Sequence, residues 1–243
     1  MNKLTIVPSV LILLLINGCE SSVRKDTNAT SESSAIVHNG TTYGVVTSKG
    51  TGRVWLDRNL GAARVCQSFN DMACYGDYYQ WGRNFDGHQD STSGTTNNQA
   101  TDLNNTGTDF IVDSGKFRKD WANKEDKSGD KRMDMISSYD GSFICPKDFR
   151  IPKMGEFLVE TSQASKPVTN NLGAYRSFLK LPSSGLRNGA TGKMRIDDIY
   201  ATYMVSGGNY DYSADYFYYS EDKIGRGSLG SRVTGSTVRC IKN

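Results

Sequence analysis

The sequence predicts a single α+β domain with mostly antiparallel strands, carried behind an N-terminal leader and a polar tether. Three observations lead to this fold class. Short β-type runs separated by glycine turns stand near both ends of the chain, at 36–56 and 199–241. Between them, apolar residues at helical spacing indicate a helix over 153–165. Finally, 25 glycines against 5 prolines in 243 residues are typical of a loop-rich domain rather than a helical bundle.

Residues 1–18 have the pattern of a signal peptide, with Lys3 ahead of an apolar run at 4–16. Gly18 before Cys19 resembles the bacterial lipobox, which implies a diacylglycerol thioether on Cys19, cleavage before it and acylation of the new amine. Glu20 follows where aspartate would be the inner-membrane retention signal, so we expect an outer-membrane lipid anchor in the cell envelope, periplasmic or surface-exposed. A simple cleaved signal with an incidental Cys19 is the alternative.

Residues 19–35 are a predicted flexible tether that leads from the lipidated cysteine to the domain. The segment is rich in Ser, Thr and Asn and has no aromatic residue, so it cannot bury enough apolar surface to offset its ordering entropy. We therefore expect one folded domain over 36–243.

The charge and histidine content limit the function. A net charge of +3 without a basic run does not indicate a nucleic-acid surface. His38 and His88 are the two histidines, and their separation argues against a multi-histidine metal site. We expect neither a metal nor another cofactor.

The elements of the domain follow in order. Asn39-Gly40 predicts a hairpin between two short strands, and residues 53–56 alternate as a further strand. A long polar insertion at about 84–131 predicts an irregular functional loop. The proline-bounded run 149–152 predicts an edge strand that leads into the helix 153–165. The remaining expected elements are a shorter helix at 172–179 and strands at 199–206, 216–220 and 237–241.

Five motifs occur in an order that resembles the Fibrobacter succinogenes major paralogous domain family. They are VWLDRNL at 54–60, YGDYYQWG at 75–82, CPKDFRIP at 145–152, LPSSGLR at 181–187 and VRCIK at 238–242. The resemblance covers roughly 40–243 and implies a C-type lectin-like fold, in which a twisted antiparallel sheet and two helices carry long irregular loops. This chain departs from the family at Phe149, where tryptophan is usual, and in the length of the 84–131 insertion.

The cysteines predict disulfide bonds. With Cys19 lipidated, four cysteines remain in an oxidising compartment, which allows three pairings. The resemblance supports Cys145–Cys240, since both residues stand in family motifs, and Cys66–Cys74 would then close a short loop. A four-thiolate zinc site is the competing interpretation, but the spacings lack a C-x₂₋₄-C knuckle.

We expect no catalytic activity. Enzymes that generate formylglycine share a version of the lectin-like fold and use a reactive cysteine pair. Cys66 and Cys74 stand in a polar loop without a nearby Lys, His or helix start that would lower a thiol pKa, and Arg64 is the only close cation. Serine-hydrolase, Walker and dinucleotide motifs are absent from the sequence. The calcium–sugar motifs of C-type lectins are absent too. Asp126, Asp130 and Asp134 lack the ligand spacing of a calcium loop and are expected to be solvated charges.

A binding role is the remaining interpretation. Residues 207–219 hold six aromatics on a glycine-rich segment, and the tip residues Tyr210, Asp211 and Tyr212 are candidate ligand contacts. The alternative for Tyr216 to Tyr219 is a strand of a β-hairpin, in which half of these aromatic side chains pack in the core. The expected function is surface recognition or adhesion to a glycan or protein. A structural or assembly lipoprotein that binds another envelope component is the alternative.

Overall fold

The computed structural model describes residues 35–113, 115, 119–123, 126, 128–162, 167–207, 213–228 and 231–243. Residues 33–243 form one compact unit, and all described residues belong to it. The predicted α+β class is confirmed, because small antiparallel sheets combine with three α-helices in the described part of the chain. None of the helices described there is long and apolar enough to cross a membrane.

The N-terminal hairpin forms as predicted. Strands β1 (Ile36–His38) and β2 (Thr41–Tyr43) pair antiparallel, with Ile36 opposite Tyr43. The turn residues Asn39 and Gly40 both have positive φ, at 46° and 76°, as a two-residue hairpin turn of this type requires.

A four-stranded sheet separates two apolar clusters of the core. Its order is β3 (Val45–Thr47), β4 (Val54–Leu56), β15 (Ile241–Lys242) and β8 (Phe149–Arg150), so β8 is the edge strand that the prolines predict. Successive side chains of a strand point to opposite faces. Trp55 therefore joins one cluster and Leu56 the other, and both are fully buried.

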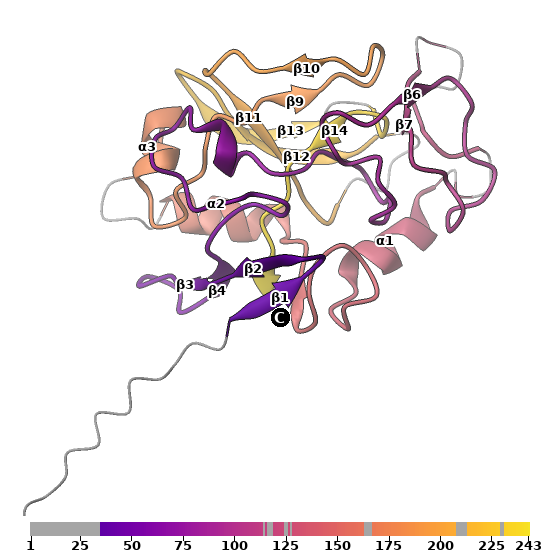
Figure 1. Ribbon diagram of the computed structural model, residues 1–243. Helices are drawn as coiled ribbons and strands as arrows, with labels where there is room; N and C mark the ends of the chain where they lie inside the picture. Colours follow the sequence, from indigo (N-terminus) through magenta and orange to yellow (C-terminus); the bar gives the residue numbers. More distant parts are fainter. Residues whose placement is uncertain are drawn as a thin grey trace, which may run out of the picture. The chain divides into compact units, whose positions relative to one another are not determined.

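Helix α2 (Met154–Ser162) covers one face of the three-stranded sheet β11 (Ala201–Met204), β12 (Asp215–Tyr219) and β13 (Ile224–Ser228) (Figure 1). Phe157 of the helix stacks on Phe217 of the central strand, with ring centroids 4.5 Å apart. Trp55 packs against Phe157 as well, with ring centroids 5.1 Å apart.

Strand β13 is not among the elements expected from the sequence, because its alternating glycines have low strand propensity.

A second four-stranded sheet supports the long insertion. Its order is β10 (Met194–Arg195), β9 (Leu186–Arg187), β14 (Gly235–Ser236) and β5 (Tyr79–Gln80). Single bridges from Gly185 to Ala201 and from Tyr203 to Thr237 connect it to β11. Within the insertion, β6 (Thr95–Thr96) and β7 (Phe110–Ile111) form a short parallel pair.

The expectation of two helices is wrong, since α1 (Asp130–Ser137) precedes α2 and α3 (Asn171–Arg176). Sequence periodicity missed α1 because its residues DKRMDMIS are mostly polar, and Ile136 alone among them is a fully buried apolar residue. Helix α3 lies where the second helix was expected, and the Asn170 side chain caps it by accepting from the Gly173 N–H at 2.9 Å. A 3₁₀ turn, η1 (Met72–Cys74), completes the helical elements.

Candidate functional site

The ligand residues expected from the sequence, Tyr210, Asp211 and Tyr212, lie outside the described residues, as does the expected lipidation site Cys19. The strand that follows is described. Tyr216, Phe217 and Tyr219 are fully buried in the core, and Tyr218 is half-buried. The aromatic residues of β12 therefore stabilise the fold and present little surface for a ligand.

Both predicted disulfides are present. Cys66 bonds Cys74 with Cα atoms 5.0 Å apart, and Cys145 bonds Cys240 with Cα atoms 6.0 Å apart. The first closes the loop at η1, and the second joins the segment before β8 to the segment before β15. Because all four thiols are used, neither the zinc site nor a reactive Cys66–Cys74 pair is formed in this structure.

A buried arginine organises the start of the long insertion. The Arg83 side chain is fully buried, and its Nε donates to the Asp86 carboxylate at 2.7 Å. Its Nη1 donates to the Gln80 side-chain oxygen at 2.8 Å and to the Asp109 carbonyl at 2.9 Å. Its Nη2 donates to the carbonyls of Thr106 and Gly107 at 3.2 and 2.8 Å. One guanidinium thus satisfies backbone carbonyls that no helix or sheet would satisfy.

A second buried arginine fixes the neighbouring part of the insertion. Arg187 of β9 donates to the carbonyls of His88, Asp90 and Ser93 at 3.2, 2.8 and 2.7 Å. It also donates to the Ser93 hydroxyl at 2.6 Å and to the Gly192 carbonyl at 2.9 Å. The guanidinium carbon also lies 4.2 Å from the centroid of the Phe110 ring, so a cation–π contact adds to the hydrogen bonds.

The side chains of His88 and Asp86 form a hydrogen-bonded pair, and the geometry of this pair indicates a structural role. His88 Nδ1 lies 2.5 Å from Asp86 Oδ1, and Nε2 accepts from the Gln80 backbone N–H at 3.1 Å. Burial lowers the pKa of His88 to about 4, so the ring is neutral at pH 7 with its proton on Nδ1. Since both ring nitrogens are hydrogen-bonded, His88 has no free nitrogen for proton transfer or metal binding.

A third cluster of buried charges connects the end of the insertion to the core. Asp120 accepts from Arg132 at 2.7 and 3.0 Å and from Arg232 at 3.0 Å. Asp126 accepts from Arg132 Nε at 2.9 Å and from two backbone N–H groups at the start of α1. The expectation that Asp126 is a solvated loop charge is therefore wrong, because it is buried and ion-paired. Both guanidiniums lie over the Trp81 ring, at 5.6 and 4.9 Å.

These arginines are the residues that sequence analysis missed. The motifs at 181–187 and 238–242 contain Arg187 and Arg239, but the sequence predicts no role for either, because a buried arginine is rare without a carboxylate partner. For these two residues, the available signal is the position of the arginine inside an apolar or glycine-containing motif, LPSSGLR and VRCIK. Their effect is that a segment with little regular structure adopts one defined path.

The surface of residues 84–113, the first part of the insertion, is polar and carries no lysine or arginine. Between residues 84 and 113 the sequence has no lysine or arginine and five aspartates. The exposed residues are mainly short hydroxyl, amide and carboxylate side chains, namely Asp90, Ser91, Thr92, Thr95, Asn97, Asn98, Thr101, Asp102, Asn104, Asn105, Thr108 and Asp109. Such side chains offer many hydrogen-bonding groups at low cost in side-chain entropy.

Asp77 is a carboxyl group with an unusual environment. Burial raises its pKa to about 6, and the nearby Asp90 charge contributes in the same direction. The Tyr79 hydroxyl donates to it at 3.3 Å. A side chain at Gly61, where φ is +74°, would collide with this carboxyl group, so glycine is required there.

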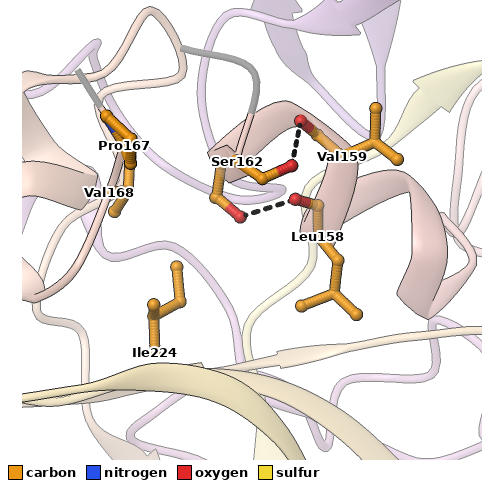
Figure 2. Close-up of a pocket in the computed structure, with 7 residues that line it drawn as sticks. Leu158, Val159, Ser162, Pro167, Val168 and Ile224 are labelled. Carbon is orange, nitrogen blue, oxygen red and sulfur yellow. Dashed lines mark hydrogen bonds between the residues drawn. The ribbon is translucent and has the colours of Figure 1, made fainter.

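A shallow apolar pocket of about 350 Å³ lies between the last turns of α2 and the residues Pro167, Val168 and Ile224 (Figure 2). The hydroxyls of Thr161 and Ser162 donate back to the helix carbonyls of Leu158 and Val159, at 3.1 and 3.2 Å. The pocket wall is therefore almost entirely aliphatic and offers no group for chemistry.

Comparison of the chain with family models, curated proteins and solved structures gave no match.

Proposed function

We propose that this chain is a lipid-anchored binding protein of the cell envelope, with a C-type lectin-like domain that recognises a glycan or a protein and has no catalytic role. The anchor is inferred from the lipobox-like sequence that ends at Cys19. The fold assignment rests on the five ordered motifs and is compatible with the α+β arrangement and the two disulfides.

The observation that carries the binding role is the arginine-supported insertion. Arg83 and Arg187 donate to nine different residues, eight between 80 and 109 and Gly192, so the polar surface above them is pre-organised. A surface that is ordered before binding does not lose further conformational entropy when a ligand binds. Recognition by loops on a rigid scaffold is a common use of such an arrangement.

The non-catalytic part of the proposal rests on the groups that chemistry would need. Both ring nitrogens of His88 are hydrogen-bonded, and the four cysteines of the domain are bonded in pairs. The carboxylates with strong partners, Asp86, Asp120 and Asp126, neutralise buried arginines.

The test is a glycan and matrix-protein array probed with the chain from residue 19, carrying Cys19→Ser to prevent acylation, with calcium and with chelator. Selective binding supports the proposal, and its loss in Tyr210→Ala plus Tyr212→Ala would locate the site at the expected tip. Absence of binding in both conditions, together with a stable complex recovered from envelope extracts, would favour the envelope-assembly alternative.

The anchor is tested separately. We expect the unsubstituted protein to incorporate radiolabelled fatty acid and to fractionate with outer membranes, and Cys19→Ser to abolish both. A Cys19→Ser chain that remains labelled would contradict a lipid anchor at this position.

A further inference from the structure

Two aromatic side chains are exposed on loops that the structure joins together. Phe85 is 45% exposed and Tyr139 is 52% exposed. They are the aromatic members of the large exposed apolar side chains in the described part of the chain.

The two loops are connected directly. The Asn84 side-chain amide donates to the Ser142 carbonyl at 3.3 Å, and the Asn84 side-chain oxygen accepts from the Phe85 N–H at 2.8 Å. On the other loop, the Tyr139 carbonyl accepts from the Asp148 N–H at 2.7 Å. The hydroxyls of Ser138 and Ser142 lie 3.2 Å apart and close the turn that carries Tyr139. These bonds join the two loops that carry the rings and order the backbone next to each ring.

The loop that carries Tyr139 also carries a carboxylate. Asp140 accepts from the Ser138 hydroxyl at 2.6 Å and from the Ser142 N–H at 2.8 Å. The hydrogen bonds from Ser138 and Ser142 lower the pKa of Asp140 to about 2, so it is ionised at pH 7. An ionised carboxylate has about four acceptor positions, and capacity therefore remains for the hydroxyls of a ligand.

We propose that Phe85 and Tyr139, with Asp140 on the Tyr139 loop, form a stacking site for a neutral glycan; this inference rests on the proposed binding function and names its ligand class. Aromatic faces carry partial negative charge and attract the C–H groups of a sugar face, and Asp140 accepts from its hydroxyls.

Two observations favour a glycan over a protein partner. The other large exposed apolar side chains do not belong to the two loops that carry the rings; they are Val37, Met72, Leu158, Leu172 and Ile199. The residues that flank the rings in sequence are mostly short and polar, namely Asn84, Ser138, Asp140 and Ser142, and the exposed Lys147 lies next to Gly141. The neutral class follows from charge, since the insertion that begins at Asn84 has aspartates but no lysine or arginine up to residue 113.

The experiment measures binding of the Cys19→Ser chain from residue 19 to an array of neutral and acidic oligosaccharides. Phe85→Ala and Tyr139→Ala are expected to weaken binding of a neutral glycan about tenfold or more each, in the range of an interface hot spot. Tyr139→Phe keeps the ring and is expected to retain binding, whereas Tyr139→Leu keeps an apolar side chain without a ring and is expected to lose it. Met72→Ala is the matched control, because Met72 is 71% exposed in η1.

The outcomes are distinguishable. Unchanged glycan binding in the Phe85→Ala plus Tyr139→Ala chain would overturn this site and leave the binding function in place, as would loss of binding only in Tyr210→Ala plus Tyr212→Ala. Equal loss in Tyr139→Phe and Tyr139→Leu would overturn stacking as the mode of recognition. Preference for acidic glycans would overturn the neutral class. No glycan binding by the unsubstituted chain would overturn both this site and a glycan as the ligand of the proposed function.

Discussion

Arg239 and Asn59 are joined by two hydrogen bonds across 180 residues of sequence. Nε and Nη2 of Arg239 donate to Asn59 Oδ1 at 3.1 and 2.9 Å, and Nη1 donates to the Leu179 carbonyl at 2.7 Å. The Asn59 amide in turn donates to the Tyr75 carbonyl at 3.0 Å. Burial lowers the pKa of Arg239, whose hydrogen-bond acceptors are uncharged oxygens. This junction connects the segments after β4 and α3 to the segment before β15.

Arg239→Met is expected to lower the free energy of unfolding by about 3–5 kcal/mol, because it leaves the Asn59 oxygen and the Leu179 carbonyl buried without donors. Chemical denaturation measures the loss. Arg226→Met is the control, since Arg226 pairs with Asp215 but its side chain is 59% exposed. That change should cost no more than about 1 kcal/mol. Equal losses in the two variants would refute the importance of the junction.

Arg187→Lys should loosen the insertion without unfolding the domain. A lysine cannot reproduce a planar fork that donates to five different oxygens. Amide hydrogen exchange should accelerate in residues 88–96, where backbone groups depend on this side chain, and should change little in β11 and β12. Arg195→Lys, at a side chain that is 62% exposed, is the control and should leave exchange unchanged. Uniform acceleration over the whole domain would contradict a local role.

The buried His88 should make stability fall in acid. Its pKa is about 4 in the folded protein and 6.5 in the reference state, so the unfolded chain binds the proton more tightly. The free energy of unfolding should therefore decrease as pH falls from about 6.5 to about 4, by on the order of 3 kcal/mol. His88→Asn should remove this slope, as followed by denaturation at several pH values. A slope that persists in His88→Asn would assign it to other groups.

Titration of Asp77 should change the free energy of unfolding in the opposite direction over part of the same pH range. Its folded pKa of about 6 exceeds the ordinary aspartate value of 3.8, so the native carboxyl binds a proton more tightly than the unfolded one. Stability from this group is therefore lost as pH rises from about 4 to about 6. Asp77→Asn should raise stability at pH 7 by about 1–2 kcal/mol after allowance for solvent screening, with no gain at pH 3.5. The His88 slope should be steeper in this background, and an unchanged profile would contradict the raised pKa.

The two disulfides should differ in their contribution to stability. Cys145–Cys240 closes 95 residues and Cys66–Cys74 closes 8. In the chain-entropy model, the longer loop contributes about 4–5 kcal/mol and the shorter one about 2–3 kcal/mol. Denaturation of the two paired Cys→Ser variants should preserve this order. A larger loss on removal of Cys66–Cys74 would show that native-state effects outweigh loop entropy.

The sequence by itself determined the features that depend on local chemistry. Asn39-Gly40 predicts the first hairpin because both residues tolerate positive φ, and the proline-bounded run at 149–152 predicts the edge strand β8. The spacing of Phe157 and Thr161 predicts α2, whose inner face they occupy. The α+β class followed from the same patterns.

Only the tertiary structure decided how the polar insertion is organised and which aromatic residues reach the surface. Helix α1 is stabilised by long-range packing of Ile136 and by the Arg132 ion pairs, and neither leaves a periodic apolar pattern. Arg83 acts on carbonyls up to 26 residues away, and Arg187 acts on carbonyls up to 99 residues away. Hydrogen bonds to backbone carbonyls carry no residue-type signature, because every residue has the same carbonyl group. For this reason, the sequence could show that the insertion is polar, but its fixed path required the fold.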